Sequence, residues 1–280
     1  MVCKTIMRGF DSRSGLQVKK TALAILLFLL LAAVFPARAQ DFNFARAYQD
    51  YQFSLTTYDQ SYKEYTDARD FYLKNQTLTL KEEARKKTLT MLKNRDQLYI
   101  VYLTALRMRI VEVKGLTGDE KGGMYTKIDS EVSWYKDHIV NYKDEDLLEN
   151  LFDKSSESES RYKTMTIPII YEALYDISLG EEIGIRQDHE AIYSDIKSGV
   201  NNPDPFARWF NDIDNTLKIL KQNEDNSRVK LAKMFGQSYG VQNAYQNATD
   251  VLTASLKPLS QLNEFLSEVL VAINNQTQTP

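Results

Sequence analysis

Apolar and aromatic residues recur at helical spacing along nearly all of the chain after residue 40. In the first such stretch they alternate in steps of four and three residues, which places them on one face of a helix. These positions are Phe44, Tyr48, Tyr51, Leu55, Tyr58, Tyr62, Tyr65, Arg69 and Tyr72. We call the six tyrosines of this set the tyrosine ladder.

The tyrosine ladder admits two interpretations. Heptad spacing is what a seam between packed helices requires, and because each hydroxyl needs water or a partner, the seam should border the surface or a polar layer. Alternatively, a row of exposed rings would stack on the sugar rings of a cell-surface glycan. The ladder is therefore the candidate interaction surface of this chain.

A second helix is predicted after a break at residues 75–77, where Thr79 and Glu82 have capping-box spacing. Its seam is Leu89, Leu92, Asp96, Tyr99, Leu103, Leu106, Ile110 and Val113, widened by Leu98, Tyr102 and Ala105. Two long helices joined by a short loop predict an antiparallel hairpin over 40–114. Asp96 is the one acid in this seam, and a buried carboxylate needs hydrogen-bond donors. We expect it to accept a hydrogen bond from Tyr58 or Tyr62.

The rest of the chain predicts kinked, shorter helices over 115–202, a second hairpin over 203–274 and a frayed tail over 275–280. Thr117 and Glu120 have capping-box spacing, and the glycine-containing stretch 118–123 is expected to be a flexible link. The helix after it should bury Tyr125, Ile128, Val132, Tyr135, Ile139 and Tyr142. Kinks or breaks are expected at Pro168, Gly180, Gly184, Asn201–Pro205, Gly236–Gly240 and Pro258.

Residues 1–39 have the pattern of an export signal. Basic residues precede an uncharged apolar run from Thr21 to Phe35, and Pro36 and the triplet Ala37-Arg38-Ala39 follow it. The run of about 15 residues is shorter than the roughly 20 that span a membrane. We expect cleavage before Gln40, with an uncleaved anchor as the alternative, and a location outside the cytoplasm without a membrane span.

Charge and cysteine content exclude several classes of function. Without residues 1–39 the chain carries 29 basic and 37 acidic residues, a net charge of −8. Binding to a phosphate backbone needs clustered Lys and Arg, so we expect no nucleic-acid partner. The single cysteine, Cys3, lies in the leader, so the exported chain would have no disulfide, thiolate metal ligand or cysteine nucleophile.

Residues 236–240, GQSYG, match the G-x-S-x-G pattern of the hydrolase nucleophile elbow. That chemistry needs a strand-to-helix turn and a histidine later in the chain, whereas His138 and His189 both precede Ser238. We interpret the segment as a turn between helices. Neither histidine has the Glu-x-x-His or second-histidine spacing of a metal site, so both are expected in solvent or at the core edge. We predict no catalytic residue, metal or cofactor.

Three segments carry a resemblance to known sequences: residues 43–48 (NFARAY), 99–109 (YIVYLTALRMR) and 169–180 (IIYEALYDISLG). Together they resemble a group of uncharacterised exported helical proteins of small-genome, candidate-phylum bacteria. The resemblance covers most of the chain after the leader and rests on long helical patterns. It implies a bacterial envelope setting and no site residues.

The sequence thus predicts an all-α, elongated antiparallel helical bundle. We expect a non-enzymatic structural or interaction protein of the cell envelope or exterior, whose partner is a protein or a cell-surface polymer. Association into oligomers is compatible with this expectation. The alternative is a module that binds a small solute or glycan in a groove between helices.

Overall fold

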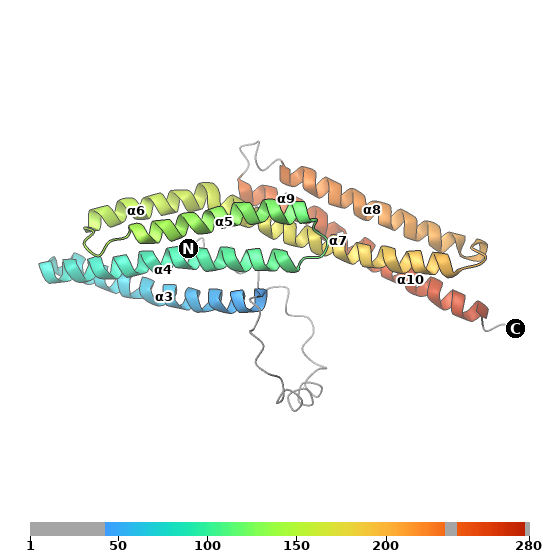
Figure 1. Cartoon of the computed structure of the whole chain (residues 1–280), viewed down its shortest axis with the longest axis horizontal. Coiled ribbons are helices and arrows are strands. Elements are labelled where there is room, and N and C mark those ends of the chain that lie inside the picture. Colours follow the sequence, from blue (N-terminus) through green and yellow to red (C-terminus); the bar gives the residue numbers. More distant parts are fainter. Residues whose placement is uncertain (1–42, 233–239, 278–280) are drawn as a thin grey trace, which may run out of the picture. The chain divides into compact units, whose positions relative to one another are not determined.

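The computed structural model describes residues 43–232 and 240–277, which belong to one compact unit beginning at Asn43. Every regular element in these residues is helical, which confirms the all-α class (Figure 1). In chain order they are α3 (Phe44–Asn75), α4 (Leu78–Glu112), α5 (Gly118–Asn141), α6 (Leu148–Arg161), the π-helical turn η2 (Tyr162–Thr166), α7 (Ile167–Gly199), the 3-10 turn η3 (Asp204–Phe206), α8 (Ala207–Ala232), α9 (Val241–Ala254) and α10 (Leu256–Thr277). The cleavage site expected before Gln40 and the predicted turn residue Ser238 lie outside the described residues.

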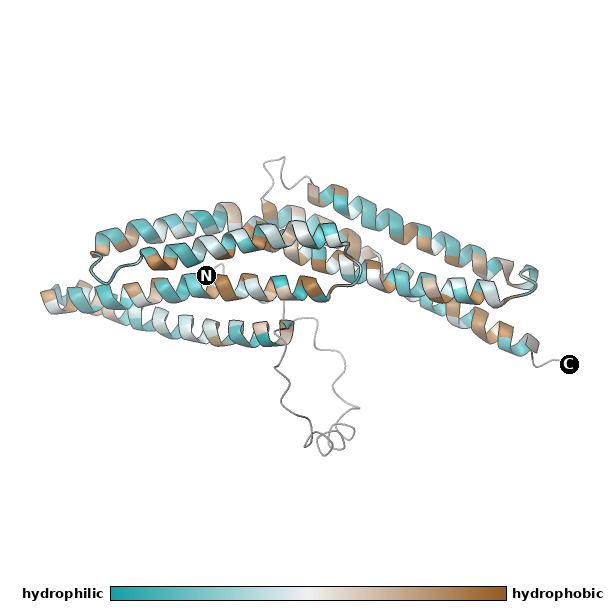
Figure 2. Ribbon diagram, in the orientation of Figure 1, coloured by the Kyte–Doolittle hydropathy of each residue, from teal (hydrophilic) through white to brown (hydrophobic). Residues whose placement is uncertain are grey.

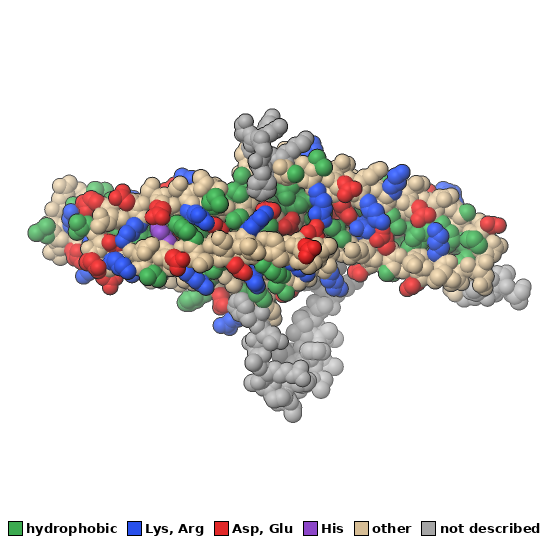
Figure 3. All heavy atoms as spheres, turned by 45° about the horizontal axis from the view of Figure 1, so that its top comes forward, with side chains coloured by type: hydrophobic (Ala, Val, Ile, Leu, Met, Phe, Trp, Pro, Cys, Tyr) green, Lys and Arg blue, Asp and Glu red, His purple; other side chains and the backbone are tan. Residues whose placement is uncertain are grey.

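The helices pack in sequence, with α4 and α7 at the centre. α3 lies along α4, which also contacts α5, α6 and α7, and α7 then contacts α8, α9 and α10. Figure 2 shows hydrophobic positions recurring between hydrophilic ones along the helices. In Figure 3, acidic and basic side chains are interspersed with apolar ones over the displayed face. No helix of the described residues is both long and apolar enough to cross a membrane.

The turn between α3 and α4 lies where the sequence places it. Gln76 has φ 43°, a left-handed conformation that ends α3, and the Thr77 side chain accepts a hydrogen bond from the Leu80 N–H at 3.3 Å. Thr77 is therefore the N-cap of α4, and the capping box predicted from Thr79 and Glu82 is wrong. Glu82 instead accepts a hydrogen bond from Arg85 at 2.7 Å.

The predicted capping box of Thr117 and Glu120 is confirmed, since both of its reciprocal hydrogen bonds are present. The stretch from Gly118 to Gly123 is not a flexible link but the first turns of α5. With the N-terminal N–H groups of the helix satisfied by the cap, the glycines there are accommodated in the helix.

Gly180 and Gly184 lie inside α7, so the break expected there is wrong. Their role is close packing, because the link between α4 and α5 crosses α7 at this point. A Cβ atom added at Gly115 would lie 2.2 Å from the carbonyl oxygen of Gly180, and one at Gly180 would lie 2.3 Å from Val113. Backbones can approach this closely only where side chains are missing.

Prolines mark two of the predicted interruptions. Pro168 follows the π-helical turn η2, and Pro258 lies in the first turn of α10, after a break at Ser255. Pro258 cannot donate a hydrogen bond to the Ala254 carbonyl, which helps to end α9 there. The break predicted at Asn201–Pro205 separates α7 from α8. α10 extends to Thr277, into the segment expected to be a frayed tail.

All eight residues of the predicted second seam, from Leu89 to Val113 at the C-cap of α4, are buried. In α3 and α5 the seam is displaced by one residue at alternate positions. The buried residues of α3 include Ala47, Ser54 and Ser61, where the hydrophobic pattern predicts Tyr48, Leu55 and Tyr62. Those of α5 include Glu131 and His138 in place of Val132 and Ile139.

Candidate functional site

A buried carboxylate joins α4, α5 and α6. Asp96 of α4 is 0% exposed and receives three contacts. His138 Nδ1 lies 2.6 Å from its Oδ2, Ser158 Oγ donates to its Oδ1 at 2.8 Å, and Arg95 Nε donates to Oδ1 at 3.1 Å. The predicted hydrogen bond from Tyr58 or Tyr62 is therefore wrong, because Asp96 faces α5 and α6 and not α3.

The His138 side chain is buried among aromatic rings and the Asp96 carboxylate. It is 3% exposed, which corrects the expectation of a solvated or core-edge histidine. The Trp134 ring is stacked on it with centroids 4.7 Å apart, and the Tyr142 ring meets it edge-on at 4.9 Å. An ionised carboxylate can only accept, so His138 donates from Nδ1 to Asp96. Its Nε2 lies 3.9 Å from Glu157 Oε2 and has no hydrogen-bond partner among the described residues.

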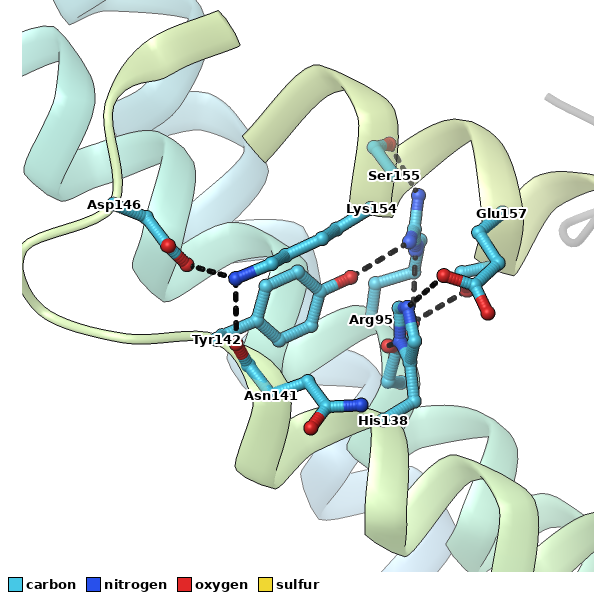
Figure 4. A network of polar contacts seen from close by, with 10 residues as sticks. Arg95, His138, Asn141, Tyr142, Asp146, Lys154, Ser155 and Glu157 are labelled. Carbon is cyan, nitrogen blue, oxygen red and sulfur yellow. Dashed lines mark hydrogen bonds and ion pairs between the residues drawn. The ribbon is translucent and has the colours of Figure 1, made fainter. Parts of the chain in front are cut away.

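Arg95 extends the network toward α6 (Figure 4). Its guanidinium donates to Ser155 Oγ at 2.9 Å and to the Tyr142 hydroxyl at 3.3 Å. Burial opposes the charge of Arg95, but the Asp96 carboxylate outweighs it and raises the Arg95 pKa. Burial and the Asp96 charge both raise the pKa of Tyr142, so this hydroxyl stays protonated.

The loop between α5 and α6 is held by a second set of contacts. Lys154 donates to the Asn141 carbonyl at 2.6 Å and to Asp146 Oδ2 at 2.5 Å (Figure 4). Arg85 of α4 donates to the carbonyl oxygens of Asp144 and Asp146 at 2.5 and 3.2 Å. Burial raises the pKa of Asp146, but the Lys154 ammonium outweighs it and the net shift is downward. The loop is thereby fixed to both helices beside it.

A third carboxylate, Glu131, continues the polar layer along α5. Arg161 donates to it through two nitrogens, at 2.5 and 3.2 Å, and Thr166 Oγ1 donates at 2.9 Å. Thr166 also contacts the Tyr135 hydroxyl at 2.9 Å. The Arg161 guanidinium lies 5.2 Å from the centre of the Trp134 ring, which itself covers His138. Trp134 thus links the contacts around Asp96 to those around Glu131.

An aspartate–histidine pair also serves as the general base in the catalytic triad of hydrolases. The surroundings of His138 decide whether it could act in this way. A general base needs a reacting hydroxyl or water at its free nitrogen. The free nitrogen of His138 is buried 3.9 Å from the Glu157 carboxylate, so in this structure it has no open face toward a substrate. The arrangement instead satisfies buried charges between three helices, and it fixes their register as a buried polar residue does in coiled coils.

The tyrosine ladder lies along the side of the α3–α4 seam. Tyr51 is buried and packs on Tyr102 with ring centroids 5.4 Å apart, whereas Tyr62 is 50% exposed. Tyr48, Tyr58, Tyr65 and Tyr72 are half-buried. Tyr62 lies between Tyr58 and Tyr65, with 6.1 Å between its ring centroid and each of theirs. The ladder therefore borders the surface, and only part of it can contact a partner.

A second buried polar layer lies between α7, α8 and the α9–α10 junction. Arg186 binds Glu224 through two nitrogens, at 2.5 and 3.1 Å, and Glu190 at 2.7 Å. Glu182 is buried one turn before Arg186. Burial raises the pKa of Glu182 to about 7, and the Ser255 hydroxyl and Arg186 only partly oppose that shift. This layer was not predicted, although Glu182, Arg186 and Glu190 follow one another at i, i+4 spacing.

The described residues contain no group of three or more His, Cys, Asp or Glu side chains that could hold a metal ion. The network around Asp96 supplies one imidazole and one buried carboxylate, together with basic groups that would repel a cation. Comparison of the chain with protein-family models, with curated proteins and with solved structures gives no match to any of them.

Proposed function

We propose that this chain is an exported, non-enzymatic structural or interaction protein of the cell envelope or exterior, which works through the surfaces of its helices. The resemblance to exported helical proteins and the leader pattern of residues 1–39 support the location. The contacts that join Asp96, His138 and Glu131 to residues of neighbouring helices support a structural role for these groups.

One observation carries the proposal: α3 is 32 residues long and packs extensively, within the described part of the chain, only on α4. Much of its surface is therefore open to a partner. Phe53 is 76% exposed and Phe71 is 60% exposed, and both lie on an otherwise polar side of this helix. Each of these side chains offers a partner apolar area that binding would remove from water.

The proposal is tested by capture from the envelope fraction of cells that produce a tagged chain. We expect the tagged protein to begin at Gln40 in that fraction and to retain a specific partner. The double variant Phe53→Ser, Phe71→Ser should lose that partner, and Phe152→Ser, which removes an exposed phenylalanine on α6, should keep it. Recovery of the chain only from the cytoplasm, or a hydrolytic activity abolished by His138→Gln, would contradict the proposal.

The alternative, glycan binding, is favoured by the half-exposed tyrosines around Tyr62. Sugar rings stack on aromatic faces, and three neighbouring rings would offer a short extended platform. Affinity electrophoresis in gels that contain cell-wall polysaccharide separates the two functions. Retardation that Tyr62→Ala abolishes, with no effect of Phe53→Ser, would favour the glycan-binding module.

A further inference from the structure

The exposed side of α3 that carries Phe53 and Phe71 has an internal symmetry. The two residues are 18 positions apart, which is about five full turns, so they lie on the same side of the helix. Arg46 on that side pairs with Asp50 at 3.4 Å. The exposed or half-exposed residues on that side include Arg46, Gln49, Asp50, Phe53, Thr57, Gln60, Glu64, Asp67, Phe71, Lys74 and Asn75. We call this set the α3 strip.

We propose that the α3 strip binds a second copy of the chain, with the two α3 helices antiparallel around a two-fold axis near residue 62. This inference rests on the proposed function, in which helix surfaces bind partners, and it names the partner. In a two-fold contact, if one residue of the first copy meets a different residue of the second, the same pair also forms with the copies exchanged. A helix can therefore bind itself only if its surface is self-complementary.

Ten residues of the α3 strip meet that condition in pairs, whereas Arg46 is level with residue 78, beyond the end of α3. Around residue 62, Phe53 of one copy is level with Phe71 of the other, and Asp50 is level with Lys74. The symmetry repeats both pairs, giving two apolar contacts and two opposite-charge contacts at the outer ends of the strip. Nearer the axis the residues that face each other can form hydrogen bonds.

The remaining pairs are polar but never of like charge. Thr57 is level with Asp67, and Gln49 with Asn75 at the outermost level. Gln60 is level with Glu64, which within one copy already accepts from Gln60 at 3.1 Å and from Lys87 of α4 at 2.9 Å. Like charges that face each other would penalise this register, and opposite charges select it over a parallel one. In a parallel pair Asp50 would face Asp50 and Lys74 would face Lys74.

The size of the strip sets the expected strength. One helix face covers less than the roughly 800 Å² per partner that a standard stable interface buries. We therefore expect a concentration-dependent dimer and not a permanent one. Between its two phenylalanines the strip is polar, as expected for a surface that is exposed to water whenever the two copies separate.

Sedimentation equilibrium of the purified full chain tests the proposal, at about 1 to 300 µM so that a weak dimer is visible. We expect Phe53→Ser to weaken dimerisation tenfold or more. Asp50→Lys and Lys74→Asp should each weaken it, because each places two like-charge pairs in the contact. The double charge reversal Asp50→Lys, Lys74→Asp should restore it. Phe152→Ser is the matched control and should leave the dimer unchanged.

A chain that stays monomeric throughout, single charge variants without effect, or a double variant that fails to restore the dimer would each overturn the proposal. Association driven by residues 1–39 would not respond to the charge reversal. Disulfide trapping in a Cys3→Ser background is the second measurement. A mixture of Phe53→Cys and Phe71→Cys chains should cross-link, whereas each variant alone should not, because its two cysteines would lie about 27 Å apart.

A failure of the dimer and a failure of the proposed function give different results. If the purified chain is monomeric but the tagged chain still captures a different protein through Phe53 and Phe71, the interaction role stands and the homodimer is excluded. If neither occurs, both are excluded.

Discussion

Replacing Asp96 with alanine should be among the most destabilising single changes in the described helices. Asp96 accepts from His138, Ser158 and Arg95 at 2.6, 2.8 and 3.1 Å and is fully buried. Removing one partner of a buried charge pair costs about 3–5 kcal/mol, because the other charge is left uncompensated. The neighbouring hydroxyl would also lose its acceptor, so we expect a total loss of about 3–5 kcal/mol in the free energy of unfolding.

Urea unfolding followed by circular dichroism measures this loss. The matched control is Asp129→Ala. This change removes a solvent-exposed carboxylate of α5 that pairs with Arg107 of α4, and it should cost about 0–1 kcal/mol. A double-mutant cycle of Asp96→Ala with Ser158→Ala should give a coupling of about 1–3 kcal/mol, whereas Tyr58→Phe should be additive with Asp96→Ala. A loss below about 1 kcal/mol for Asp96→Ala, or strict additivity with Ser158→Ala, would refute the reasoning.

Two further predictions concern packing and pH. Gly115→Ala should lower the free energy of unfolding by about 1–3 kcal/mol in the same assay, because its Cβ would lie 2.2 Å from the Gly180 carbonyl oxygen, whereas Gly118→Ala, whose Cβ would meet nothing within 4 Å, should not. Equal unfolding curves for the two variants would show that the crossing can relax. Glu182 has a pKa raised from 4.5 to about 7, so the folded state binds its proton more tightly than the unfolded chain and loses stability as pH rises between those values. Glu182→Gln should therefore be more stable than the unsubstituted chain at pH 8 by about 2–3 kcal/mol and nearly equal at pH 4.5. Glu181→Gln, at a half-exposed neighbour that pairs with Arg109 at 2.9 Å, should show no such gain with rising pH. A difference that does not change with pH would mean that Glu182 is not the titrating group.

The hydrophobic pattern alone was sufficient for the fold class and for the seam of α4. Apolar residues cover a wide face of this helix, so both the predicted seam and the flanking Leu98, Tyr102 and Ala105 are buried. In α3 and α5 two neighbouring frames fit the spacing, and choosing the more apolar one selected Tyr62 over Ser61 and Ile139 over His138. Burial in the folded chain went to the smaller or more polar residue in each case.

The physical reasons for these displacements differ between the two helices. In α3, small side chains at Ala47, Ser54 and Ser61 allow α4 to lie close, and the bulkier tyrosines then border the seam. In α5, Glu131 and His138 are buried because α4 and α6 supply partners for them. Such partners come from distant parts of the chain, so one helix's periodicity cannot reveal them.

The polar network was only partly accessible from the sequence. Asp96 could be recognised as an acid in an apolar seam, and the need for a partner followed from its burial. Which residue becomes that partner depends on which helices pack against α4 at the level of Asp96. The assumption that α3 covers all of α4 led to Tyr58, whereas His138 and Ser158 approach from the opposite side.

The most direct test of an interaction role for α3 is photo-cross-linking in the cells that make the protein. A photoreactive phenylalanine analogue at position 53, with one at position 152 as the control, reports what contacts the α3 strip in its own compartment. The account predicts an extracytoplasmic product at position 53 in which residues near Phe71 of a second copy are linked to the probe, and no such product at position 152. Equal labelling at both positions, or no product at position 53, would contradict it.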